Sequence, residues 1–144
     1  MTVSSHWFVI VNPCAGGLKA KKQWAVLQKA LISDDVAYKY AITQYKSHAQ
    51  ILVMHAIEEG YRKFIVVGGD GSINEVVNGF FQQQHCAIDD LYLTAFACGT
   101  GNDWASYYQL PTHPQNFISM IKQCDVVLQD IGCVEYNDNK ALTK

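Results

Sequence analysis

Apolar residues along the chain fall into two patterns that predict an alternation of strands and helices. Short apolar or alternating runs predict strands over residues 7–11, 36–42, 64–67 and 91–97. Apolar residues at helical spacing follow the first three runs and predict helices over residues 20–31, 49–57 and 73–81. Such an alternation is typical of a parallel sheet with right-handed crossovers. The pattern therefore predicts a three-layer, Rossmann-like α/β fold with helices on both faces of the sheet.

Further details of the sequence predict where one helix ends, which face of another is buried, and which elements follow residue 100. Gly60 is placed to end the helix over residues 49–57. The helix over residues 73–81 is expected to bury one apolar face, made of Ile73, Val76, Val77, Phe80 and Phe81. After residue 100, the sequence predicts a short helix over residues 104–108, a helix opened by Pro114 and a last strand over residues 125–136.

The central strand leads into a glycine-rich turn, Gly68-Gly69-Asp70-Gly71-Ser72, which the helix over residues 73–81 follows. Glycines let a ligand approach the backbone closely, and a helix N-terminus offers unpaired N–H groups and positive charge. The turn is therefore a candidate phosphate cradle. Asp70 would repel a phosphate unless Mg²⁺ lies between them, or unless the carboxylate takes a proton from the phosphate acceptor. The alternative is a plain connection in which Asp70 is an ordinary helix N-cap.

Two further glycine turns follow predicted strands, at residues 12–17 and 98–103. In a parallel sheet the carboxyl ends of the strands share one edge, where ligands of open α/β folds bind. Three such turns at one edge favour a ligand that carries phosphate. The spacing matches neither the dinucleotide fingerprint nor the phosphate-binding loop that contains a lysine.

Composition narrows the class of protein. The chain has 144 residues, 49% hydrophobic and 17% charged, which predicts one globular domain. A net charge of −2 gives no case for nucleic acid as the main partner. Four lysines on the first helix (Lys19, Lys21, Lys22 and Lys29) form a solvated face or attract phosphates or an anionic membrane.

The sequence also favours a cytoplasmic location. The five cysteines are odd in number and widely spread, which is typical of reduced thiols. The N-terminus lacks the pattern of a signal peptide, and no apolar run reaches the length of a membrane span. The five histidines have no metal-ligand spacing.

The three turns, in this order, resemble the diacylglycerol kinase catalytic domain, which is the nucleotide-binding half of soluble bacterial lipid kinases and of sphingosine and ceramide kinases. The matching stretches are residues 11–16, 68–79 and 99–105. NAD kinases and phosphofructokinases share the middle motif. The pair Asn102-Asp103, which follows the glycines of the third turn, is more specific to lipid kinases. The resemblance implies a fold like that of NAD kinase and phosphofructokinase.

The resemblance also implies roles for individual residues. Gly68, Gly69, Asp70, Gly71 and Ser72 would hold the phosphates of ATP. Further nucleotide contacts would come from Asn12, Thr43, Asn74, Gly99, Thr100, Gly101 and Asn102. Asp70 would serve Mg²⁺ or act as the base. Asp103 would lie near the acceptor hydroxyl, or cap a helix. Glu75 would be a ligand, or form a capping box with Ser72.

The resemblance further implies an enzyme that transfers the γ-phosphate of ATP to a lipid hydroxyl, meeting its lipid transiently at a membrane surface. Members of this family continue into a β-rich second domain. Residues 1–125 would then be the nucleotide-binding domain, and residues 126–144 the last strand and the start of the link. An NAD-kinase-like enzyme and a non-catalytic nucleotide-binding module are the alternatives, and homodimerisation is left open.

Overall fold

The computed structural model describes residues 3–134 and contains one parallel sheet. Its strand order is β2-β1-β3-β4. The elements in chain order are β1 (Trp7–Val11), α1 (Lys19–Ser33), β2 (Tyr38–Ile42), α2 (His48–Glu58), β3 (Lys63–Gly68), α3 (Asp70–Gln82), the short 3₁₀ helix η1 (Ile88–Asp90), β4 (Tyr92–Ala97), α4 (Asp103–Tyr107) and α5 (Pro114–Gln123). The predicted alternation of strands and helices is confirmed.

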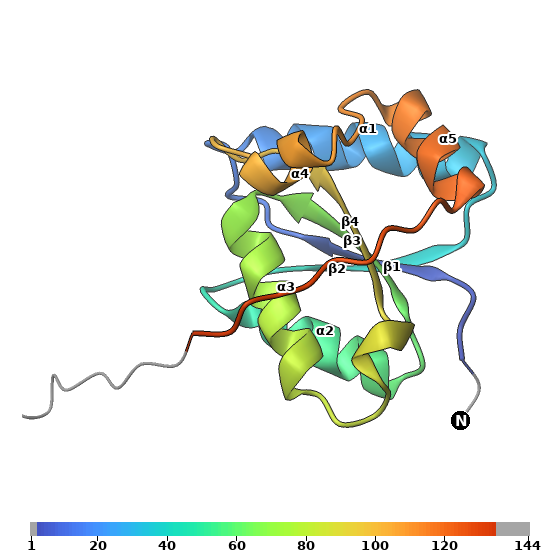
Figure 1. Cartoon of the computed structure of the whole chain (residues 1–144). Helices are drawn as coiled ribbons and strands as arrows, with labels where there is room; N and C mark the ends of the chain where they lie inside the picture. Colours follow the sequence, from blue (N-terminus) through green and yellow to red (C-terminus); the bar gives the residue numbers. More distant parts are fainter. Residues whose placement is uncertain (1–2, 135–144) are drawn as a thin grey trace, which may run out of the picture.

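The sheet lies between two helical layers, as the pattern predicted (Figure 1). Successive residues of a strand point to opposite faces, so each central strand serves two cores. Val9 and Ile65 pack in the core covered by α1 and α5. Ile10 and Val66 pack in the core covered by α2 and α3. Because β1 and β3 are buried on both faces, their sequences are continuous apolar runs.

Local signals at helix ends and faces were mostly confirmed. Gly60 follows α2 with φ of +106°, a conformation that glycine adopts without strain. Pro114 is the first residue of α5. Phe81 corrects the expected α3 face, because its side chain is 55% exposed whereas Phe80 is buried. Consecutive helical residues point about 100° apart, so Phe80 points into the core while Phe81 points to solvent.

The predicted strand over residues 125–136 is wrong for residues 125–134, which have neither helix nor strand. Residues 135 and 136 of the predicted strand lie outside the described residues. A strand forms only when a neighbour pairs with its backbone, and these apolar residues have no such neighbour in the described part of the chain. Val127, Leu128 and Val134 are each at least 70% exposed.

Candidate functional site

Hydrogen bonds between neighbouring strands align the ends of all four strands. The N–H of Thr43 donates to the carbonyl of Val11 at 2.8 Å. The N–H of Asn12 donates to the carbonyl of Val67 at 2.9 Å, on the other side of β1. At the far side of β3, Cys98 donates to Gly68 at 2.8 Å. The three glycine turns therefore lie at one edge of the sheet, as predicted.

The first and second turns are joined by side chains. Nδ2 of Asn12 donates to Oγ of Ser72 at 3.1 Å, while Oδ1 of Asn12 accepts from the N–H of Cys14 at 3.1 Å. A Cβ at Gly68 would lie 2.7 Å from Oγ of Ser72, so the strand end has room for glycine alone. Asn12 and Ser72, both predicted to contact the nucleotide, are thus held in fixed positions by each other.

The first turn also packs on the third through Gly16, a residue that the sequence analysis did not single out as a site residue. Gly16 has φ of +61°, and a Cβ there would collide with the carbonyl oxygen of Cys98. The adjacent pair Gly16-Gly17 was the available signal, since consecutive glycines after a strand often mark close backbone approach. Gly17 has φ of +64° but nothing within 4 Å of its missing Cβ.

We expect Gly16→Ala to destabilise the fold much more than Gly17→Ala. Both changes place alanine in the left-handed region, at a cost of roughly 1–2 kcal/mol. Only Gly16→Ala adds a clash with backbone, so its loss in the free energy of unfolding should be larger by about 1–3 kcal/mol. Urea unfolding of the two variants measures this difference. Equal losses would show that the first and third turns are not in contact.

The second and third turns are in direct backbone contact. A Cβ at Gly99 would lie 2.7 Å from Cα of Gly69, and a Cβ at Gly69 would lie 3.0 Å from Cα of Gly99. Asn102 shapes the third turn, because its side chain accepts from the N–H of Gly99 at 2.8 Å and donates to the Gly99 carbonyl at 2.9 Å. Asn102 itself is left-handed, with φ of +55°.

Asp70 caps a helix, but not the helix that the sequence suggested. It is the first residue of α3, whose N-cap is Gly69. Its carboxylate accepts from the N–H of Asp103 at 2.9 Å and from the N–H of Trp104 at 3.2 Å, both in the first turn of α4. The interpretation of Asp70 as an N-cap of its own helix is therefore wrong. A carboxylate has about four acceptor sites, so these bonds leave capacity for a further partner.

The capping alternatives for Asp103 and Glu75 are also wrong. The N-cap of α4 is Asn102, and Asp103 is an exposed residue in the first helical turn. Ser72 lies inside α3 and not at its N-cap, so it cannot form a capping box with Glu75. Oε1 of Glu75 is buried and has no hydrogen-bond partner among the described residues.

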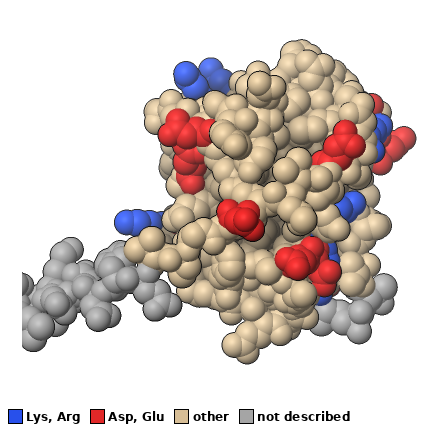
Figure 2. Space-filling view, viewed as in Figure 1, with Lys and Arg blue, Asp and Glu red and all other residues tan. Residues whose placement is uncertain are grey.

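The remaining predicted residues are exposed or partly exposed at this edge. Thr100, Gly101 and Asn74 are exposed, and Thr43 is partly exposed at the end of β2. A Cβ at Gly101 would lie 3.5 Å from Oδ2 of Asp70. A Cβ at Gly71, the second residue of α3, would have nothing within 4 Å. The helix N-terminus is therefore accessible to a ligand. In Figure 2, acidic side chains lie over the same ends of α3 and α4.

Beneath the third turn, Cys98 is buried and its thiol donates to the carbonyl of Phe96 at 3.3 Å. Burial raises the pKa of this thiol to about 11, so it stays protonated and unreactive at neutral pH. Cys14 in the first turn is an exposed free thiol. Cys98 is thus part of the packing below the site.

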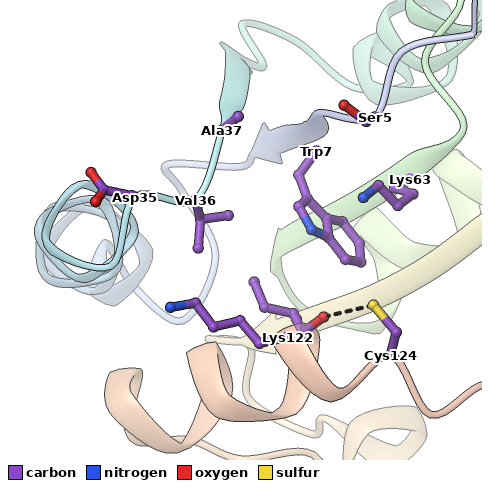
Figure 3. Close-up of a pocket in the computed structure, with 9 residues that line it drawn as sticks. Ser5, Trp7, Asp35, Val36, Ala37, Lys63, Lys122 and Cys124 are labelled. Carbon is purple, nitrogen blue, oxygen red and sulfur yellow. Dashed lines mark hydrogen bonds between the residues drawn. The ribbon is translucent and has the colours of Figure 1, made fainter.

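A hollow at the opposite edge of the sheet is not part of this site (Figure 3). It has a volume of about 260 Å³ and lies at the amino ends of β1 and β3, next to Trp7 and Lys63. Nζ of Lys63 lies 5.1 Å from the centre of the Trp7 ring, so its charge faces an aromatic partner. None of the three glycine turns reaches this hollow.

The family model described as the diacylglycerol kinase catalytic domain matches residues 6–134. The chain belongs to this family. It is 35% identical over 109 residues to the putative lipid kinase YtlR of Bacillus subtilis, covering 74% of the chain and 34% of that protein. It is 32% identical over 128 residues to the diacylglycerol kinase of Staphylococcus carnosus, covering 86% of the chain and 39% of that protein.

Comparison with solved structures supports the fold of this diacylglycerol kinase family member. The crystal structure of a diacylglycerol kinase from Bacillus anthracis str. Sterne matches with a TM-score of 0.67 and 21% sequence identity, covering 82% of this chain and 42% of the other. The expectation of a three-layer α/β fold shared with lipid kinases is confirmed. The chain spans between a third and two fifths of the length of the two relatives named above.

Proposed function

We propose that this chain is the nucleotide-binding part of a lipid kinase that transfers the γ-phosphate of ATP to a lipid hydroxyl. Membership of the family supports a kinase with a lipid acceptor. The single observation that carries the proposal is the open N-terminus of α3, where Gly71 leaves the backbone N–H groups accessible beside the carboxylate of Asp70. Those N–H groups and the helix dipole would bind the phosphates of the nucleotide.

The residues at this edge also fit Mg²⁺. Within residues 3–134, no cluster of three or more His, Cys, Asp or Glu side chains is arranged to hold a metal ion. Mg²⁺ does not need such a cluster, because one or two carboxylates together with substrate phosphates and water can hold it. Asp70 is the carboxylate fixed beside the phosphate cradle, so it would be the ligand from this chain. The metal would neutralise charge on the transferred phosphoryl group.

The chain's own residues would act by positioning. Asn12 and Ser72 hold the first two turns together, and the contact of Gly69 with Gly99 holds the third turn against them. A rigid edge of this kind places the N–H groups before the ligand arrives, which is how preorganised dipoles stabilise developing charge. Asp103, exposed at the start of α4, is the proposed contact to the acceptor hydroxyl.

We expect Gly71→Ala to raise stability and lower nucleotide affinity. Alanine is favoured over glycine in a helix by up to about 1 kcal/mol, and here the added methyl meets no protein atom. If the phosphates bind at the start of α3, the same methyl would hinder their approach, so affinity for ATP–Mg²⁺ should fall by about tenfold or more. Thermal unfolding and isothermal titration calorimetry measure the two effects.

Asn78→Ala is the matched control, because Asn78 is an exposed residue in the same helix but two turns away from its N-terminus. It should raise stability and leave affinity unchanged. If Gly71→Ala bound ATP–Mg²⁺ as tightly as the parent, the phosphate site would not lie at the start of α3.

A further inference from the structure

The solvent side of α1 combines lysines with exposed apolar side chains. The α1 outer face, as we name it, consists of Lys22, Ala25, Val26, Lys29 and Ile32. All five are exposed, and their spacing of three or four residues places them on one side of the helix. The opposite side is buried against the sheet and α5. Ile32 is 62% and Val26 is 49% exposed, and Leu18 at the start of the helix is 63% exposed.

The charge of α1 is positive without compensation inside the helix. Its fifteen residues contain four lysines and no aspartate or glutamate. The whole chain has a net charge of −2, so subtracting these four positive charges leaves −6 on the rest. Basic side chains lie over the N-terminal end of α1 at the upper left in Figure 2.

Between residues 12 and 35, acidic groups occur only after this helix ends. Asp34 and Asp35 follow its last turn. The carboxylate of Asp34 is 3.5 Å from Nζ of Lys122 on α5, so a further cation already neutralises it. Asp35 is exposed. The first three turns of the helix therefore present positive charge to solvent.

A hollow adjoins the outer face. It has a volume of about 430 Å³ and lies between α1 and the start of α5. Val26 and Lys29 of the outer face line it together with His113, Pro114 and Gln115. An apolar wall with a cation beside it suits a group that is partly apolar and partly anionic, such as the head and upper chain of an anionic lipid.

We propose that the α1 outer face docks on the surface of an anionic lipid bilayer. Lysines attract the negative lipid surface while the aliphatic side chains between them enter its outer apolar layer. A protein partner fits less well, because protein interfaces favour aromatic residues and arginine and disfavour lysine, and this face has neither aromatic residues nor arginine. No helix among the described residues is long and apolar enough to cross a membrane.

This inference deepens the proposed function, since a lipid kinase must reach an acceptor held in a membrane. It would place the glycine turns close to the lipid, because α1 begins directly after the first turn, at the edge of the sheet where all three turns lie. Its test uses no kinase activity and no nucleotide. Failure of lipid docking and failure of ATP binding can therefore be told apart.

Co-sedimentation of the chain with lipid vesicles tests the proposal. The chain should bind vesicles of phosphatidylcholine with 30% phosphatidylserine (roughly the anionic lipids of a cytoplasmic leaflet) and not pure phosphatidylcholine. Binding should weaken as salt rises from low to physiological concentration. The variant Lys22→Gln/Lys29→Gln should bind roughly 30-fold more weakly, because each lysine near the surface contributes about 1 kcal/mol.

The matched control is Lys39→Gln/Lys46→Gln, which removes the same charge elsewhere. Lys39 is paired with Glu59 at the end of α2, away from the α1 layer, and Lys46 is exposed in the loop before α2. This control should bind like the parent. Equal binding by the two double variants, or equal binding to both vesicle types, would overturn the proposal. A change in oligomeric state caused by Lys22→Gln/Lys29→Gln would instead assign the face to a second copy and would also overturn it.

A fluorescent probe tests the orientation independently. With Cys14, Cys86, Cys124 and Cys133 replaced by serine, an environment-sensitive dye is attached at Val26→Cys or, as control, at Asn78→Cys on the opposite helical layer. Anionic vesicles should shift the emission of the dye to the blue at residue 26 and leave it unchanged at residue 78. An equal shift at both positions would contradict docking through α1.

Discussion

Asp70→Asn is expected to weaken both the fold around the site and the magnesium dependence of ATP binding. The carboxylate accepts two backbone N–H groups at the start of α4, at 2.9 and 3.2 Å. Asparagine offers one oxygen to these two donors, and its NH₂ group would face the other. One backbone N–H at the start of α4 would lose its protein partner, and the loss of a helix cap costs about 0.5–2 kcal/mol of stability.

The effect on nucleotide binding has a separate cause. If Asp70 is the chain's ligand for Mg²⁺, removal of its charge should leave ATP affinity nearly the same with and without the metal. Calorimetric titration of ATP with Mg²⁺ and with EDTA, in both proteins, measures this loss. Urea unfolding of the same samples measures the stability.

Asp103→Asn is the matched control for Asp70→Asn. The Asp103 side chain is exposed, so its loss of charge should change stability by less than about 0.5 kcal/mol. Nucleotide affinity and its magnesium dependence should also persist. If Asp70→Asn behaved like Asp103→Asn in both measurements, Asp70 would be neither the cap of α4 nor the ligand of the metal.

Almost no lipid phosphorylation is expected from residues 1–144 alone, even though they should bind ATP weakly. The chain spans 34% and 39% of two of the relatives that it matches, and we propose that the remaining part supplies the second wall of the active site. With one wall, water reaches the γ-phosphate and weakens every electrostatic contribution. If that part also supplies the general base, its loss by itself would lower the rate by roughly 10²- to 10⁴-fold.

A radiolabelled ATP assay measures this prediction with diacylglycerol, sphingosine and NAD as acceptors. The full-length diacylglycerol kinase of Staphylococcus carnosus is the positive control. Calorimetry on the same preparation should show that the chain still binds nucleotide, since its two apolar cores lie within residues 8–121. Rapid, magnesium-dependent phosphorylation of a lipid by this chain would contradict the need for a second domain. Rapid phosphorylation of NAD would contradict a lipid acceptor.

The sequence by itself determined the order and type of the strands and α-helices up to residue 123, but not the short 3₁₀ helix η1. Local apolar spacing decides whether a segment can bury a strand or a helical face, so this information is present in each segment. The parallel topology then required the turns at Asn12, Gly68 and Gly99 to meet at one edge. The three turn motifs were also specific enough to indicate the family that the comparisons show.

Only the tertiary structure decided which groups pair across that edge. Asp70 bonds to Trp104, 34 residues away, and Gly16 packs against Cys98. An aspartate before a helix looks the same whether it caps its own helix or a neighbouring one, because the choice depends on which unpaired N–H groups the fold brings close. Residues 125–134 show the same limit, since a strand-like sequence becomes a strand only where another strand offers its backbone.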